Sequence, residues 1–312
     1  MRKVNRILTV SNLDLAEYCA ERHELTAVGV FSSGIYFEDD KGKILMLHDR
    51  AYGSLPFGLA GAEINDKAKN LGIAVETVLS LEHNCLLLAD GNMLAGIEYR
   101  PYVDRKPVST AAEGIGFLQN SGGEFLKTQN RSSLSLFSVK DSAQIKPDEL
   151  DDIFASAGLA GIQRIEQGIR TENFAKLSTG LDGILGLGRG LTPSFDDFIT
   201  GMISTLHFCA REWGIELPAR AEICSLIAEK AEKKTNQYSA AYLLAAATGG
   251  RFSMIEDVLA ASGGDGWLDA AGRLTSTGGS SGADMMAGVV FTARIINEII
   301  AEAPTKSWHD CC

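Results

Sequence analysis

Residues 186–197 combine glycines, hydroxyl side chains, an arginine and two carboxylates directly before an apolar run. The segment reads Gly186-Leu187-Gly188-Arg189-Gly190-Leu191-Thr192-Pro193-Ser194-Phe195-Asp196-Asp197. Glycines at alternate positions allow backbone N–H groups to turn toward a ligand where a Cβ would clash. A helix that starts near Ser194 would add unpaired N–H groups and the positive end of its dipole, both of which attract anions. The segment therefore predicts an anion-binding loop that leads into a helix.

A second segment near the C-terminus repeats this logic. The pattern Ser-x-x-Asp-x-x-x-Gly occurs at Ser194, Asp197 and Gly201, and again in residues 281–288 with Ser281, Gly282, Asp284 and Gly288. A glycine-rich stretch also precedes the second copy. We predict that each serine starts a helix and that the two helix starts lie close enough to share one pocket.

A purely structural interpretation of both copies is also open. A serine followed three residues later by an acid resembles a capping box, in which the hydroxyl and the carboxylate satisfy backbone N–H groups at the start of a helix. The pairs Ser194/Asp197 and Ser281/Asp284 fit that pattern. Capping alone explains neither the density of glycines nor the presence of Arg189 and Asp196.

The first loop suits a small anion. Backbone N–H groups and the helix dipole would hold its oxygens, and Arg189 would offer a permanently charged, forked contact. The hydroxyls of Thr192 and Ser194 can donate as well. Asp196 and Asp197 would bind substrate N–H groups, a hard divalent cation such as magnesium, or the backbone of their own helix.

Thr235 and Ser239 form a second polar feature. They lie four positions apart, and so on one face of a helix, beside the amide of Asn236. They can line the same pocket as the loop, or they can belong to an ordinary solvated helix surface.

Several function classes are disfavoured. The first loop lacks the lysine that follows the last glycine of a nucleotide-binding P-loop, and no convincing strand precedes it as a dinucleotide fingerprint requires. No Gly-x-Ser-x-Gly elbow is present, and no cysteine has an evident histidine partner. The formal net charge of −11 and the absence of a Lys/Arg-rich block argue against a nucleic-acid partner.

Composition also bears on compartment and on metals. The six cysteines include no Cys-x-x-Cys pair, and the five histidines lack paired zinc-ligand spacing, so we expect reduced cysteines and no structural zinc. The first apolar stretch is soon interrupted by Asp14 and Glu17, and nowhere do eighteen apolar residues follow one another. We expect a cytoplasmic protein without a membrane partner.

The 312 residues predict an α+β fold: a β-rich domain like a barrel or sandwich in residues 1–125, a connecting segment in 126–148 and a mainly helical domain in 149–306. Two hairpins are expected in the first half, one turning at Asp40-Lys41-Gly42 and one at Asp90-Gly91. The second half has apolar residues at helical spacing. Helices are expected in Leu150–Leu159, Phe198–Trp213, Ile223–Ala231, Ala240–Ala247, Met254–Ala260 and Met285–Ile300.

The motif of residues 186–197, the Thr235/Ser239 helix and Ser281-Gly282-x-Asp284 together resemble the AllH-like proteins. This family was formerly a domain of unknown function, and its named member is a subunit of anaerobic oxamate carbamoyltransferase. Two positions depart from the family's motif: Arg189 stands where proline is usual, and Phe195 where glycine is usual.

The resemblance implies reversible carbamoyl transfer in purine-ring catabolism after allantoin. Oxalurate and phosphate give oxamate and carbamoyl phosphate, and companion subunits complete a hetero-oligomeric enzyme. On this basis Gly188, Arg189 and Gly190 would bind phosphate or carboxylate, with hydrogen bonds from Thr192, Ser194, Thr235, Ser239, Ser281 and Gly282. Asp196, Asp197 and Asp284 would orient substrate amide groups or hold a divalent cation. The alternative is a non-catalytic subunit that binds a small anion or acts as a scaffold.

Overall fold

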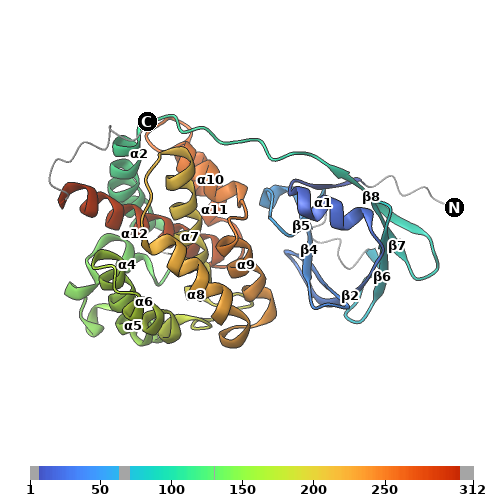
Figure 1. The fold of residues 1–312 in the computed structure, drawn as a ribbon, viewed down its shortest axis with the longest axis horizontal. Helices are drawn as coiled ribbons and strands as arrows, with labels where there is room; N and C mark the ends of the chain where they lie inside the picture. The colour runs from blue at the N-terminus through green and yellow to red at the C-terminus, as the bar shows by residue number, and fades with distance from the viewer. Residues whose placement is uncertain (1–6, 63–70, 130, 303–312) are drawn as a thin grey trace. The chain divides into compact units, whose positions relative to one another are not determined.

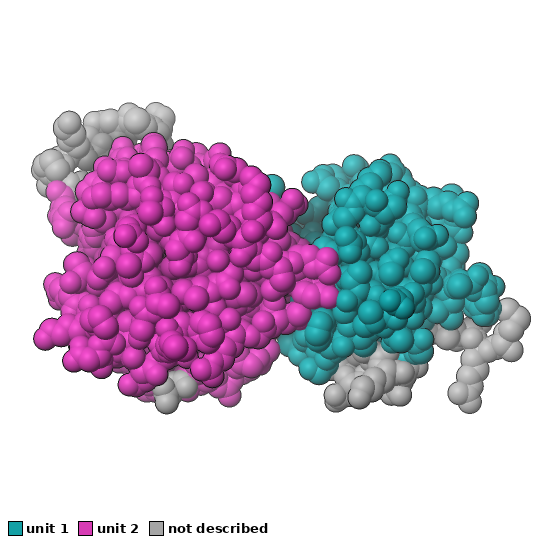
Figure 2. Space-filling model, turned by 90° about the horizontal axis from the view of Figure 1, so that it is seen from below, with its two compact units in different colours: residues 1–105, 248–254 teal, residues 106–247, 255–312 magenta. Residues whose placement is uncertain are grey.

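The computed structural model describes residues 7–62, 71–129 and 131–302. The chain forms two compact units, neither of which is continuous in sequence (Figure 2). The first comprises Met1–Arg105 and Thr248–Met254, and the second comprises Lys106–Ala247 and Ile255–Cys312. The first is a β-barrel and the second is mainly helical (Figure 1), which confirms the predicted α+β class.

The strands of the first unit close into a barrel, and parallel pairing between β1 and β8 completes it. A short helix, α1 (Leu13–Ala20), packs Leu15 and Cys19 against the barrel core. In barrel order the strands are β1 (Ile7–Val10), β5 (Gly58–Gly61), β4 (Ile44–Asp49), β3 (Gly34–Asp39), β2 (His23–Phe31), β6 (Val78–Glu82), β7 (Cys85–Leu88) and β8 (Met93–Tyr99).

Both predicted hairpins are present. β3 and β4 pair antiparallel across the Asp40-Lys41-Gly42 turn, and β7 and β8 pair across Asp90-Gly91. Alternate residues point inward, so that Phe37 and Leu45 face each other across β3 and β4 and are both fully buried. The turn residues thus correctly predict where this part of the chain reverses direction.

The segment Thr248–Met254 belongs to the first unit although helical sequence surrounds it. The Ser54 N–H donates to Ser253 Oγ at 2.7 Å, and a Cβ on Gly53 would overlap that same oxygen. A loop between β4 and β5 therefore holds this distant stretch of the chain.

The second unit is built on eleven helices within the described residues. The short α2, α3 and α4 pack against α12, and a π-helical turn at Leu118–Gly122 joins the first two. The helices are α2 (Ala111–Phe117), α3 (Gly123–Gln129), α4 (Ser135–Val139), α5 (Ile153–Arg170), α6 (Phe174–Ile184), α7 (Ser194–Glu212), α8 (Ala219–Lys234), α9 (Gln237–Ala247), α10 (Ser253–Ala260), α11 (Trp267–Thr275) and α12 (Ser281–Glu302).

Helices α7 and α12 form the centre of this unit. Nearly every residue of α7 from Phe195 to Cys209 is buried, as is every residue of α12 from Gly282 to Ile296. A helix that is buried on all sides must be covered by other helices. The two helices cross so closely that a Cβ on Gly201 would overlap the Met285 carbonyl oxygen, and a Cβ on Gly288 would overlap that of Phe198.

The division between the units differs from the organisation expected from the sequence. It falls after Arg105, earlier than residue 125, because α2 and α3 pack with the helical unit. The expected connecting segment, residues 126–148, contains α4 and two 3-10 turns and buries Phe137 and Ser138. The expected end of the helical domain at residue 306 lies outside the described residues.

Helix α6 and helix α11 were not expected from the sequence. Gly180 and Gly183 weaken the helical signal of α6, and α11 is short and follows a glycine cluster. Within the described part of the chain, no helix has the length and apolarity needed to cross a membrane.

The crossing of α7 and α12 yields a prediction about stability. Gly288→Ala should lower the free energy of unfolding by about 1–3 kcal/mol or more, because the added Cβ meets backbone that cannot rotate away. Gly272→Ala, in α11, is the control: its Cβ would meet no atom within 4 Å, so alanine should stabilise by roughly 0.4–1 kcal/mol. Urea unfolding of both variants measures the difference, and equal effects would contradict the close crossing.

Candidate functional site

The loop of residues 186–193 folds back on the start of α7. Gly188 has a φ of +140°, and a Cβ at this position would overlap the backbone nitrogen of Ser194. Gly186 has a φ of +77°, and a Cβ there would overlap the carbonyl oxygen of Lys234 at the end of α8. The backbone thus requires glycine at both positions.

The two predicted helix starts lie together. Helix α7 begins at Ser194 and α12 at Ser281, and Thr192 Oγ1 lies 3.0 Å from Ser281 Oγ. This contact confirms that the repeated pattern brings the two copies to one place. The glycine crossing explains it, because Gly201 and Gly288 each lie four residues after the aspartate of their copy.

Asp197 is buried at this meeting point. Its Oδ2 accepts a hydrogen bond from Thr192 Oγ1 at 2.8 Å, and the nearby Ser281 hydroxyl also favours the charged carboxylate. Burial raises the pKa of Asp197 well above its usual range; the charge of Asp284 adds to the rise, and the two hydroxyls oppose it.

Asp284 is buried on the facing helix. Its Oδ1 accepts a hydrogen bond from Ser132 Oγ at 2.6 Å, whereas its Oδ2 makes no hydrogen bond. Burial raises the pKa of Asp284 to about 6, and the hydroxyls of Ser132, Ser280 and Ser194 act against this rise. The hydroxyls of Ser280 and Ser194 thus lie near the Asp284 carboxylate and favour its charged form.

Neither carboxylate of this pair has a basic partner among the described residues. The contrast is Glu166, equally buried, which bonds Arg294 at 2.8 Å and whose pKa is held at about 2 by that guanidinium despite the burial that opposes it. Buried acids without a counter-charge are costly to the fold and are common at functional sites. We call Asp197, Asp284, Thr192, Ser281 and Ser132 the aspartate-pair cluster.

Asp196 belongs to a different cluster. Its Oδ1 accepts from the Gly186 N–H at 2.8 Å, and its Oδ2 accepts from Thr235 Oγ1 at 2.5 Å and Ser239 Oγ at 2.8 Å. Burial raises the pKa of Asp196, and these three donors oppose the rise. Thr235 and Ser239, predicted to line the pocket, thus face Asp196, and the carboxylate ties the loop to the start of α9.

The capping interpretation is wrong for the first copy. The N-cap residue of α7 is Pro193, which has no side chain able to cap, and Ser194 is already the first helical residue. The Asp197 carboxylate accepts from hydroxyls rather than from the N–H of a serine cap. The serine and the aspartate of this copy are thus left for other contacts.

Arg189 lies at the outside of the loop. Its side chain is 75% exposed, it reaches Asp152 Oδ2 at 3.9 Å, and it lies over the Phe154 ring. Gly190 follows with a φ of +97° and ordinary packing space. Phe195, the other departure from the family's motif, is fully buried, and a Cβ on Gly158 would overlap its ring, so it serves the core.

Gly282 is buried against the end of α11. Its N–H donates to the Thr277 carbonyl at 3.1 Å, and a Cβ at this position would overlap the Leu274 carbonyl oxygen. Glycine therefore lets the start of α12 pack tightly against α11. Because the Gly282 N–H already donates within the protein, it is not available to a ligand.

Ser132 is the functional candidate that the sequence did not reveal. It lies in the polar segment expected to be a connection, 152 positions from the aspartate it contacts. No periodicity or motif marks it, since only the tertiary fold brings it to α12.

Metal ligands are scarce at the aspartate pair. The described residues include no group of three or more His, Cys, Asp or Glu side chains that could hold a metal ion. A divalent cation would have to take its ligands from Asp197, Asp284, hydroxyls and substrate.

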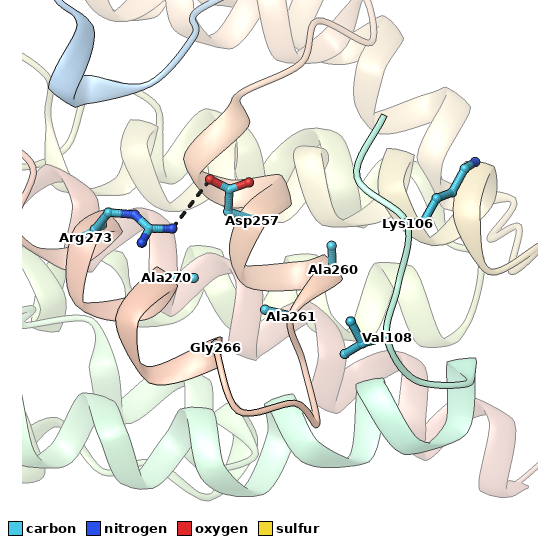
Figure 3. A pocket seen from close by; sticks show the side chains of 8 residues that line it. All are labelled: Lys106, Val108, Asp257, Ala260, Ala261, Gly266, Ala270 and Arg273. Carbon is cyan, nitrogen blue, oxygen red and sulfur yellow. Dashed lines mark ion pairs between the residues drawn. The ribbon is translucent and has the colours of Figure 1, made fainter. Parts of the chain in front are cut away.

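A separate depression of about 270 Å³ lies beside α10 and α11 (Figure 3). It contains none of the predicted site residues. Its cations are already paired, Arg273 with Asp257 at 3.7 Å and Lys106 with Glu212 at 3.0 Å, so they offer little charge to a ligand. The lining residues are Lys106, Val108, Asp257, Ala260, Ala261, Gly266, Ala270 and Arg273.

Comparison with protein families finds a match in the helical unit. Residues 184–293 match the model of the family described as oxamate carbamoyltransferase subunit AllH, which confirms the resemblance inferred from the motifs. The matched segment contains both glycine-rich stretches, α7 and most of α12. No curated protein matches the chain, and no solved structure does.

The raised pKa of Asp284 predicts a pH dependence of stability. Because the folded state favours the protonated carboxyl, this group stabilises the fold at low pH, and its contribution is lost as the pH rises through about 6. The shift from 3.8 to about 6 corresponds to about 3 kcal/mol. Wild type should therefore lose most of this stability relative to Asp284→Asn between pH 4 and pH 7.

Urea unfolding across this pH range measures the effect. Asp182→Asn is the control. Lys230 lowers the pKa of Asp182, so wild type should gain stability relative to Asp182→Asn as the pH rises. A pH-independent difference between wild type and Asp284→Asn would contradict the raised pKa.

Proposed function

We propose that this chain is a subunit of a carbamoyltransferase that acts on oxamate or oxalurate and on carbamoyl phosphate, in the degradation of the purine ring after allantoin. Companion subunits would complete the enzyme, as the word subunit in the family description suggests. Four members of the aspartate-pair cluster support this proposal because they lie within the segment that matches the family: Thr192, Asp197, Ser281 and Asp284.

One observation carries the proposal: Asp284 Oδ2 is buried and accepts no hydrogen bond, beside a second buried carboxylate. A buried acceptor without a donor is costly, so a ligand that brings an N–H group would bind there. Oxamate, oxalurate and carbamoyl phosphate all carry an amide or carbamoyl nitrogen. In this proposal Asp197 and Asp284 orient that nitrogen, and Asp196 holds the loop.

The anionic end of the substrate would lie at the loop. Backbone N–H groups around Gly188 and Gly190, the positive end of α7 and the exposed guanidinium of Arg189 favour phosphate or carboxylate. Ser194 would donate from the first turn of α7. The same donors would stabilise negative charge that develops on the carbamoyl oxygen.

The reaction needs proton transfer but no covalent intermediate on the protein. In the direction of oxalurate breakdown, a phosphate oxygen bonds to the carbamoyl carbon and the bond from that carbon to the oxamate nitrogen breaks. The proton that phosphate gives up ends on the oxamate nitrogen. A carboxyl group whose pKa is raised by burial, such as Asp197, can carry it.

A non-catalytic subunit that binds a small anion or acts as a scaffold is the second candidate. The position of Arg189 favours it, since the guanidinium is exposed and contacts Asp152 rather than an enclosed site. In the assembled enzyme, Asp284→Asn should lower kcat/KM on the order of 10²-fold if the pair orients substrate. Full activity in Asp284→Asn would favour the scaffold, and Asp182→Asn serves as a surface control.

Arg189 gives a second test. Arg189→Ala should weaken binding of carbamoyl phosphate by about 1.5–3 kcal/mol, the range for hydrogen bonds to charged groups. Folding should be nearly unchanged because the side chain is exposed. Calorimetric titration and thermal melts measure the two effects, with Arg164→Ala, another exposed arginine of the helical unit, as the matched control. Equal affinity in both variants would remove Arg189 from the site.

A further inference from the structure

The hydroxyl of Ser132 has a fixed direction. Its oxygen accepts a hydrogen bond from the Leu134 N–H at 3.1 Å and lies 2.6 Å from Asp284 Oδ1. A hydroxyl has one hydrogen, and the N–H of Leu134 uses a lone pair, so the hydrogen is available to the carboxylate. Ser132 therefore donates to Asp284.

The backbone around Ser132 is anchored on both sides. Arg131 donates to the Thr275 carbonyl at the end of α11 at 3.1 Å, and Leu134 is fully buried. Ser132 itself is 6% exposed. The donor is therefore held in place by the fold before any ligand arrives.

The consequence is an asymmetric carboxylate. Asp284 has one oxygen engaged by Ser132 and one oxygen without a donor. Asp196, equally buried, shows the alternative, because donors occupy both of its oxygens. Burial alone thus does not leave Oδ2 free; the arrangement of donors around Asp284 does.

We propose, on the basis of the function proposed above, that Ser132 is a positioning residue that sets the selectivity of the site for a primary amide over a carboxylate. By occupying Oδ1, it fixes the orientation in which Oδ2 accepts an N–H of the ligand's amide. A carboxylate in the same place would bring no donor for Oδ2 and would be repelled by the charged form of Asp284. The amide end of the ligand therefore lies inward and its anionic end lies toward Arg189.

Oxamate and oxalate test this directly, since oxalate has a carboxylate where oxamate has its amide. A site built to bond an N–H group can reject an analogue that lacks it on the order of 10⁴-fold. Binding of both ligands is measured by calorimetry with the full chain in the assembled enzyme. Ser132→Ala should weaken oxamate binding about tenfold and reduce the ratio of oxamate affinity to oxalate affinity. Its thermal stability should stay close to that of the control.

Ser138→Ala is the matched control. Ser138 is also buried and also donates to α12, but to the Ala287 carbonyl oxygen at 2.8 Å rather than to Asp284. Ser138→Ala should keep the wild-type ratio of oxamate affinity to oxalate affinity. Ser132→Thr retains a hydroxyl and should restore selectivity, which also separates the role of the hydroxyl from a packing defect in Ser132→Ala.

A second readout needs no substrate. The carboxyl pKa of Asp284, followed by ¹³C NMR in the full chain, should rise in Ser132→Ala because the charged form loses a donor, and should stay unchanged in Ser138→Ala. An unchanged pKa or an unchanged ligand ratio in Ser132→Ala, with oxamate still bound by wild type, would overturn the role of Ser132 alone. Failure of wild type to bind oxamate would overturn the proposed function.

Discussion

The contact on which the helical unit depends is the crossing of α7 and α12 at Gly201 and Gly288. The contact is reciprocal. Gly201 of α7 lies against the carbonyl of Met285 in α12, and Gly288 of α12 lies against the carbonyl of Phe198 in α7. Two helices can approach this closely only where side chains are absent from the contact. As a result, Asp197 and Asp284, which lie one turn before Gly201 and Gly288, are brought close together.

Because the two central helices are covered on all sides, their polar groups must find partners within the protein. Thr200, Thr205 and Thr292 do so by donating to the carbonyl four residues earlier in their own helix. Arg294 does so by pairing with Glu166. Asp197 and Asp284 have only hydroxyls, and hydroxyls do not neutralise charge. The helical unit thus buries some acids beside a basic partner, as with Glu166 and Arg294, and others, such as Asp197 and Asp284, beside hydroxyls alone.

Local sequence signals predicted what is local in the structure. The turn residues Asp40-Lys41-Gly42 and Asp90-Gly91 predicted both hairpins. Apolar spacing predicted the long helices, including the two that start at Ser194 and Ser281. The repeated pattern even predicted that these two helix starts meet. Ser132 could not be found in this way, because a polar segment carries no periodicity and its partner is distant in sequence. The sequence also could not predict that Asp196 and Asp197 have different partners. Adjacent residues on a helix point in different directions, and only the surrounding helices show which donors each carboxylate meets.

The division of the chain into interleaved units has a consequence for the way the protein can be taken apart. A cut after Arg105 would remove the barrel but leave Thr248–Met254 behind, with Ser253 deprived of its hydrogen bond from Ser54. Residues 248–254, which would be left behind, lie directly before the remainder of α10. A division that keeps each unit whole would therefore have to separate the chain at three places, after Arg105, after Ala247 and after Met254.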